Sequence, residues 1–140
     1  MVPKRILNRE FFLYFLEHEV KRSQRYQNFF CLLVLTLGKP PVSNEAGSFQ
    51  TSYRKLLSWL AEDLRDCDII GKLGDARVAV LLPYADASAG LQTQSRLEKS
   101  LSYCALNRGG WELEIQEVCF PVDGTNTHDL LGRKLPNESS

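Results

Sequence analysis

The residue types that most often carry catalysis lie in this chain without the neighbours that catalysis needs. His18 and His128, the two histidines, show no metal-ligand spacing. No serine or cysteine lies in a motif of an activated nucleophile, and Lys72-Leu73-Gly74-Asp75 lacks the pattern of a phosphate-binding loop. The residues present therefore argue against an enzyme.

The cysteines argue against a metal centre as well. They form no Cys-x-x-Cys pair, so we expect reduced structural thiols in place of disulfides or zinc ligands. The four cysteines are Cys31, Cys67, Cys104 and Cys119.

The elements that would position any site are organised around a β-hairpin. The segment Asp68–Pro83 has two apolar runs around a short polar turn that contains Gly74 and Asp75. The second run, Val78–Leu82, is apolar throughout, which is typical of a central strand buried on both faces. The almost wholly apolar stretch Phe29–Leu37 predicts another buried strand.

Three helices are predicted from apolar residues at helical spacing. The first runs from Asn8 to about Gln27, and the second from Thr51 to about Arg65. The third runs to about Tyr103 after Asp86 as its N-cap. The residues expected to face inward are Phe12, Phe15, Leu16 and Val20 in the first, Tyr53, Leu56, Leu57, Leu60 and Leu64 in the second, and Leu91, Leu97 and Leu101 in the third.

The remaining segments connect or complete these elements. Gly38–Ser48 is rich in Gly, Pro and Ser and predicts a loop, and Asn107–Gly110 predicts a turn. Trp111–Gln116 alternates apolar and polar residues like a half-buried strand, and the phase change at Glu117 predicts a bulge. Thr127–Leu131 can start a last helix.

The order of these elements, α-β-α-β-β-α-β, predicts the α/β (α+β) class. The expected architecture is a ferredoxin-like or palm sandwich, with a central antiparallel sheet flanked by helices. The length of 140 residues predicts a single domain over 1–140, and 44% hydrophobic with 24% charged residues argues against disorder.

Charge and hydropathy limit the partners. Basic and acidic residues both total 17, so no global field favours nucleic acid or a membrane surface. The longest apolar run, Phe29–Leu35, is too short for membrane insertion, and the charged N-terminus does not fit a signal peptide. These features predict a cytoplasmic protein.

Several short motifs lie in one register that resembles the GGDEF domain of diguanylate cyclases. Ala79-Val80-Leu81-Leu82-Pro83 matches the family's "AVLLP"-like strand, and Leu7-Asn8-Arg9-Glu10-Phe11-Phe12 matches the opening of its first helix. Pro121-Val122-Asp123-Gly124 is similar to the "P.DG" that follows a later strand. The resemblance covers roughly residues 7–131, and 132–140 forms a polar tail.

The resemblance implies that the catalytic parts of the family are lost. The degenerate GGDEF turn consists of Gly74, Asp75, Ala76, Arg77 and Val78. Arg77 thus replaces a glutamate that serves magnesium, and Thr36 and Gly38 occupy the positions of acidic ligands. Magnesium requires hard oxygen ligands, and the family's last helix with its phosphate-contacting lysine is also missing. We therefore expect no cyclase activity, no metal and no cofactor.

One binding motif of the family is kept. Arg65-Asp66-Cys67-Asp68 precedes Gly74 at the spacing of the RxxD motif, through which many GGDEF proteins bind the product cyclic di-GMP and are inhibited. By this resemblance, Arg65 would donate to the O6/N7 edge of a guanine and Asp68 would accept from its N1–H and N2–H₂. Arg22 of the first helix, often supplied in the family by a second subunit, is the candidate for a further contact.

Arg65 and Asp68 also have a purely structural interpretation. A cation near a helix C-terminus is favourable to the helix dipole, and an aspartate before this strand is common in the family. Two hypotheses follow. The chain is either an inactive GGDEF-like regulatory domain that binds cyclic di-GMP, or a non-binding pseudoenzyme that forms a homodimer or docks another signalling domain.

Overall fold

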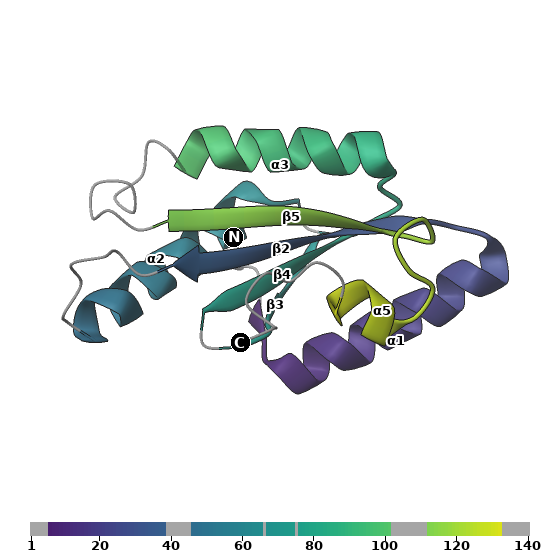
Figure 1. Cartoon of the computed structure of the whole chain (residues 1–140), viewed down its shortest axis with the longest axis horizontal. Helices are drawn as coiled ribbons and strands as arrows, with labels where there is room; N and C mark the ends of the chain where they lie inside the picture. Colours follow the sequence, from purple (N-terminus) through teal and green to yellow (C-terminus); the bar gives the residue numbers. More distant parts are fainter. Residues whose placement is uncertain (1–5, 39–45, 66, 75, 102–111, 133–140) are drawn as a thin grey trace.

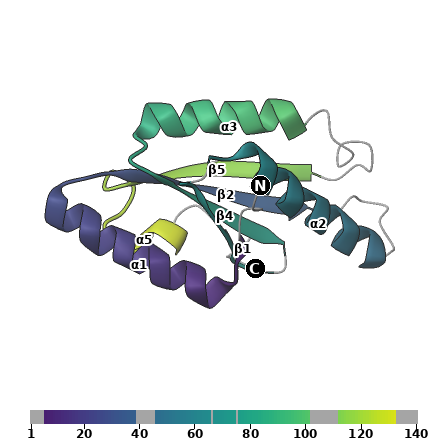
Figure 2. The same cartoon turned by 180° about the vertical axis from the view of Figure 1, so that it is seen from behind.

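The computed structural model of the protein describes residues 6–38, 46–65, 67–74, 76–101 and 112–132. Figures 1 and 2 show one sheet with α3 along one face and α1 with α5 along the other. The elements are β1 (Ile6–Leu7), α1 (Arg9–Tyr26), β2 (Phe30–Gly38), α2 (Ala46–Asp63), β3 (Ile69–Lys72), β4 (Arg77–Pro83), α3 (Ala87–Leu101), β5 (Glu112–Phe120) and α5 (Thr127–Gly132).

The sheet has five strands in the order β1-β3-β4-β2-β5. The central strand β2 pairs antiparallel with β4 on one side and with β5 on the other. β3 and β4 form the predicted hairpin, and the apolar residues of β4 are buried. The predictions of a hairpin and of a buried second strand are therefore confirmed. The predicted sandwich is confirmed with one correction. The edge strand β1 was missed, and it pairs parallel with β3.

Each face of the sheet carries its own apolar core. Odd-numbered residues of β2, from Cys31 to Leu37, pack with α2 and α3. Even-numbered residues, from Phe30 to Val34, pack with α1 and α5. The alternation of side chains along a strand separates the two cores, and this is why β2 is apolar at nearly every position.

Helix α1 begins and ends close to the predicted bounds. The Asn8 side chain accepts from the backbone N–H of Phe11 at 2.9 Å, and Gln27 ends the helix in the left-handed conformation with φ 57°. Phe12, Leu16 and Val20 are buried as predicted. The prediction for Phe15 was wrong, because 44% of this residue is exposed on the outer side of the helix.

Helix α2 starts at Ala46, earlier than the predicted Thr51, so the last part of the predicted loop Gly38–Ser48 is helical. Its expected inward residues are all buried, which confirms that prediction. They are Tyr53, Leu56, Leu57, Leu60 and Leu64.

The N-cap of helix α3 is confirmed, since the Asp86 carboxylate accepts from the backbone N–H of Ala89 at 2.8 Å. Leu97 is fully buried as expected, but 53% of Leu91 is exposed, so its inward placement was wrong. The side chain of Leu101 and the predicted turn Asn107–Gly110 lie outside the described residues.

β5 is continuous, and the bulge predicted at Glu117 is absent from this described strand. Its register against β2 runs without interruption from Glu112 to Phe120. The change of phase has another cause. Val118 and Phe120 are buried on the α1 side while Ile115 and Cys119 are buried on the other, so both faces are covered toward the end of the strand. Within the described part of the chain, no helix combines the length and the apolar character needed to cross a membrane.

Candidate functional site

The turn over residues 74–78, which resembles a GGDEF turn, joins β3 and β4 and is fixed on two sides. The backbone N–H of Leu73 donates to the carbonyl of Arg77 at 3.0 Å, which closes the turn. The N–H of Leu37 in β2 donates to the carbonyl of Ala76 at 2.9 Å. The Tyr53 hydroxyl of α2 donates to the carbonyl of Gly74 at 3.3 Å. Val78 is buried in β4, and Asp75 lies outside the described residues.

The positions that resemble a metal site do come together. Thr36 lies opposite Arg77 of β4 and opposite Glu114 of β5, and Gly38 ends the same strand. This set offers a hydroxyl, a guanidinium and one exposed carboxylate. A magnesium ion needs several anionic or carbonyl oxygens, and an adjacent cation opposes it. These residues do not fit the magnesium ion that the resemblance to the GGDEF domain implies.

A hollow of about 780 Å³ lies beside the turn, on the α1 and α5 face. Arg9 and Leu73 both line it, and the Arg9 guanidinium donates to the carbonyl of Leu73 at 2.5 Å. Its walls mix charges of both signs with apolar atoms, so it has no single chemical preference. The other lining residues are Glu10, Leu13, Tyr14, Glu17, Arg77, Thr127, His128, Leu131 and Gly132.

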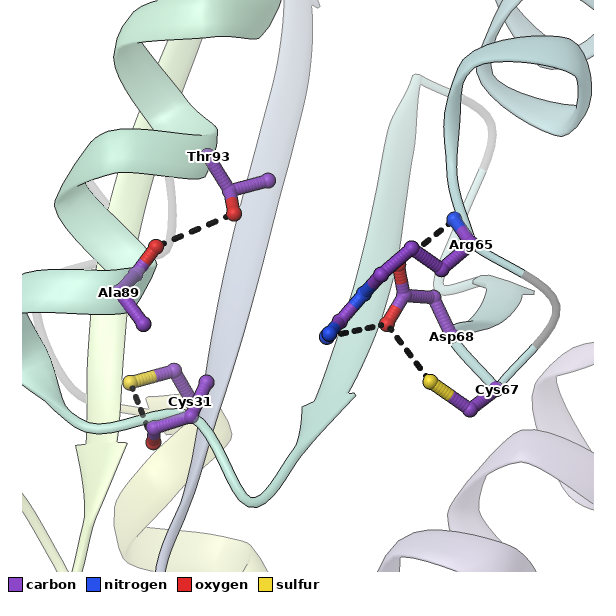
Figure 3. A network of polar contacts seen from close by, with 7 residues as sticks. Cys31, Arg65, Cys67, Asp68, Ala89 and Thr93 are labelled. Atoms are coloured by element: carbon purple, nitrogen blue, oxygen red, sulfur yellow. Dashed lines mark hydrogen bonds and ion pairs between the residues drawn. The ribbon is translucent and has the colours of Figure 1, made fainter.

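Arg65 and Asp68 form a compact turn at the other end of β3 (Figure 3). The Asp68 Oδ2 accepts from the backbone N–H of Arg65 at 3.0 Å, and its Oδ1 lies 3.2 Å from the Arg65 Nη2. The Asp68 side chain is 1% exposed, whereas that of Arg65 is 62% exposed. The hydrogen bond to Asp68 and its negative charge raise the pKa of Arg65. In this motif the Arg65 guanidinium is therefore exposed to solvent, while the Asp68 carboxylate that pairs with it is buried.

The structure does not bring Arg22 into contact with this pair within one chain. Arg22 forms an ion pair with Glu19 at 2.5 Å, donates to the Tyr84 hydroxyl at 2.8 Å and lies 4.9 Å from the Tyr84 ring centre. It does lie at the same end of the sheet. Tyr84 follows β4, and the end of β4 pairs with the beginning of β3 directly after Asp68.

Tyr84 was missed from the sequence. Its ring is 60% exposed, and its backbone has φ 60°, a left-handed conformation that is unusual for a bulky residue. Such strain concentrates at functional positions. The signal in the sequence was a large aromatic residue directly after the strand-ending Pro83, where a polar turn residue is usual.

No protein-family model and no curated protein matches the chain, but solved structures do. A DGC protein from Thermotoga maritima has a TM-score of 0.76 and 16% identity, over 91% of this chain and 92% of that one. The GGDEF domain of DgcB from Caulobacter crescentus, solved in complex with c-di-GMP, has a TM-score of 0.71 and 16% identity, over 93% of this chain and 79% of that one. The diguanylate cyclase SiaD from Pseudomonas aeruginosa, solved in complex with its activator SiaC, has a TM-score of 0.60 and 20% identity, over 80% of this chain and 46% of that one. The chain therefore has the fold of GGDEF diguanylate cyclase domains.

Proposed function

We propose that the protein is a catalytically inactive GGDEF-like regulatory domain that binds cyclic di-GMP through Arg65 and Asp68, with Arg22 as a helper. The observation that carries the proposal is the exposed guanidinium of Arg65, oriented by the buried carboxylate of Asp68. Orientation by a buried partner lowers the entropy lost when the guanidinium binds a planar ligand. The complex of DgcB with c-di-GMP supports this class of ligand for the fold.

The chemistry of recognition follows from the two side chains. A guanidinium can donate two hydrogen bonds to the O6 and N7 atoms of a guanine. The Asp68 carboxylate is 1% exposed, so it can accept from the guanine N1–H and N2–H₂ only when the Arg65 side chain moves away from its Oδ1 atom. The exposed ring of Tyr84 adds a surface on which a base can stack, next to the guanidinium of Arg22. A micromolar complex needs about −8.2 kcal/mol. One bidentate contact gives about 1–3 kcal/mol of discrimination and one stacked base about 1–3 kcal/mol, so both of them and further contacts must contribute.

Calorimetry with cyclic di-GMP and GTP tests the proposal. Cyclic di-GMP should bind more tightly than GTP, and Arg65→Ala should weaken its binding by about tenfold or more, equivalent to roughly 1.4 kcal/mol. Arg54→Ala is the matched control, because Arg54 is an exposed arginine of α2, the helix that leads into the motif. Folded protein that gives no heat with high micromolar cyclic di-GMP would overturn the proposal. Equal losses of affinity in Arg65→Ala and Arg54→Ala would show that the binding site does not depend on Arg65.

Asp68 is tested by base preference. Asp68→Ala should narrow the difference in affinity between cyclic di-GMP and cyclic di-AMP, since the guanine donors then lack an acceptor. Asp68→Asn is the companion variant, because its amide oxygen can still accept from the Arg65 N–H and keep the turn. A preference that is unchanged in both folded variants would show that Asp68 is only structural.

The absence of cyclase activity is tested separately. Incubation with GTP and magnesium should give no cyclic di-GMP above background, because Thr36, Gly38 and Arg77 supply no carboxylate to a metal. Product formation that is lost in an Arg77→Ala variant would contradict this part of the proposal.

A docking module is the second candidate. Three exposed aromatic residues favour it, since Phe11, Tyr14 and Phe15 on α1 are 59%, 56% and 44% exposed. Aromatic side chains are enriched in protein interfaces. The complex of SiaD with its activator protein supports protein partners as a class for the fold.

A further inference from the structure

Cys31 and Cys119 lie directly opposite each other in neighbouring strands. Cys31 is in β2 and Cys119 in β5, and their Cα atoms are partners in the antiparallel register. The two Sγ atoms are 2.7 Å apart, closer than two unbonded sulfur atoms pack, and the residues are 0% and 5% exposed. Figure 3 shows Cys31 beside the first turns of α3. The pair is thus enclosed between the sheet and this helix.

The backbone places the pair at a position that suits a covalent link. The Cys119 N–H donates to the Asp123 carboxylate at 2.8 Å, and the Cys119 carbonyl accepts from the Asp123 N–H at 2.7 Å. Both backbone groups of Cys119 therefore point away from β2, and Cys31 and Cys119 form a non-hydrogen-bonded pair. The Cα atoms of such pairs are about 4.5 Å apart, within the range of about 4.4–6.8 Å for disulfides.

A metal ion is the competing use of the cluster. The Oε2 atom of Glu117 lies 3.9 Å from the Cys31 Sγ, and the ligand atoms of Cys31, Glu117 and Cys119 lie within 4.8 Å of one another. Tetrahedral zinc with bonds of about 2.3 Å needs its two sulfurs about 3.8 Å apart. The sulfurs would have to separate by about 1 Å for zinc, but approach by only about 0.7 Å for a disulfide bond. The geometry favours the bond.

We infer that Cys31 and Cys119 are a site of covalent oxidation, at which a small-molecule disulfide such as oxidised glutathione converts the two thiols into a cross-strand disulfide. A thiolate first attacks the small disulfide and forms a mixed disulfide, with release of one glutathione thiolate. The second protein thiolate then attacks the protein sulfur of the mixed disulfide and displaces the second glutathione. Two protein thiols are oxidised, one glutathione disulfide is reduced to two thiols, and the thiol protons balance the two leaving thiolates.

Cys119 is the residue that attacks first. It is slightly exposed, and burial raises its pKa to about 11, whereas burial raises the pKa of the fully buried Cys31 further. Because the thiolate is the reactive form, the more acidic thiol, which belongs to the less buried residue, reacts faster. Both shifts make the oxidation slow near neutral pH, and its rate should rise with pH.

Peptide mapping of the whole folded chain tests the inference. The protein is incubated with oxidised glutathione, its remaining thiols are alkylated, and it is digested with trypsin without reduction. The sequence puts the four cysteines on four different tryptic peptides, because Lys or Arg residues that trypsin cleaves lie between each cysteine and the next. Trypsin does not cleave before Pro40, so the peptide with Cys31 extends to Arg54. The expected product joins peptide 26–54, with Cys31, to peptide 109–133, with Cys119. The oxidised protein should also unfold at a higher urea concentration, and dithiothreitol should reverse both changes.

Matched variants make the result specific. A Cys67→Ser, Cys104→Ser double variant should give the same linked peptides, since Cys67 is exposed and neither residue belongs to the pair. Cys119→Ser should lose the link. Three results would overturn the inference. They are alkylation of both thiols in the folded protein at saturating oxidant, a link through Cys67 or Cys104 instead, and zinc that copurifies and protects Cys31 and Cys119.

Discussion

Glu117 projects from β5 into the crowded space between the sheet and the first turns of α3. A Cβ atom at Gly90 of α3 would overlap its carboxylate, so the glycine makes room for this side chain. Desolvation raises the pKa of Glu117, hydrogen bonds to Cys119 and Cys31 lower it, and the charges of Asp123 and Asp86 raise it further. The net result is a raised pKa, which means that the carboxyl group is protonated more readily in the folded chain than in the unfolded chain.

We expect this preference to make stability depend on pH. A carboxyl group with a raised pKa in the folded state favours folding fully below its unfolded pKa, and this contribution is lost as the pH rises through the folded pKa. Glu117→Gln removes the cost of burying the charge. The variant should therefore gain stability relative to the natural chain as the pH rises above the unfolded pKa of about 4.3, measured by urea unfolding. Glu114→Gln, at an exposed site on the same strand, is the control. A difference in stability between Glu117→Gln and the natural chain that is the same at all pH values would contradict the explanation.

For the polar residues of the candidate site, the sequence was informative about proximity and uninformative about burial. The spacing of Arg65 and Asp68 made it predictable that they meet in one turn, because three positions span one local turn. It could not show that Asp68 is buried beneath the exposed Arg65, since this depends on how α2 and β3 pack. The contact of Arg22 with Tyr84 depends on residues 62 positions apart and on a left-handed backbone, which no local pattern encodes.

Helix α1 approaches the sheet closely at Gly71 of β3. A Cβ atom there would overlap the ring of Phe12, which is fully buried. We expect Gly71→Ala to lower the free energy of unfolding by about 1–3 kcal/mol, as for other overpacked core sites. Gly74→Ala is the matched control, because no atom lies within 4 Å of a Cβ built there, and its effect should stay within about 0.5 kcal/mol. Urea denaturation measures the free energy of unfolding of both variants. Equal effects would show that the close contact between Gly71 and Phe12 does not limit the size of residue 71.

The beginning of α1 depends on a side-chain cap. The Asn8 carboxamide oxygen satisfies the N–H of Phe11, one of the helix's first unpaired donors. Asn8→Ala should cost about 0.5–2 kcal/mol of stability by urea denaturation. Asn8→Asp should retain most of it, because aspartate also caps and its charge suits the helix dipole. A loss in Asn8→Asp as large as in Asn8→Ala would indicate that the cap contributes little.

The elements that were predicted well are those with a strong local pattern. The apolar stripe of α2 and the continuous apolar run of β4 each encode their own burial. β1 was missed because two residues carry no periodicity, and its pairing with β3 joins positions 64 residues apart. The apparent bulge at Glu117 came from helices packing on both faces of β5, which alternation within one strand cannot reveal.

The oligomeric state distinguishes the two functional candidates for the whole molecule. If the domain is a receptor with Arg22 supplied by a second subunit, cyclic di-GMP should increase the dimer fraction in analytical ultracentrifugation, and Arg65→Ala should abolish that increase. If it is a docking module, dimers should form equally with and without nucleotide and survive Arg65→Ala. Tyr14→Glu should then weaken them, since Tyr14 is 56% exposed on the aromatic face of α1.

The overall fold was predictable because its layers follow from apolar patterns and from a recognisable order of elements. The candidate site was less predictable. That Thr36, Gly38 and Arg77 offer no carboxylate follows from their residue types alone, and the structure places Thr36 opposite Arg77. Whether Arg65 faces solvent, and which aromatic residue lies nearby, depends on long-range pairing between β3, β4 and α1.

The position of β2 at the centre of the sheet has a consequence for synthesis of the chain. Cys31 and its partner Cys119 are separated by 88 positions, and translation at about 5–20 residues per second crosses that distance in about 4–18 s. During this interval the apolar strand β2 has left the ribosome, while the edge that β5 will cover is still open. Unpaired apolar edges attract other strands. The time before β5 arrives is therefore the stage at which a chaperone or a neighbouring nascent chain competes with folding.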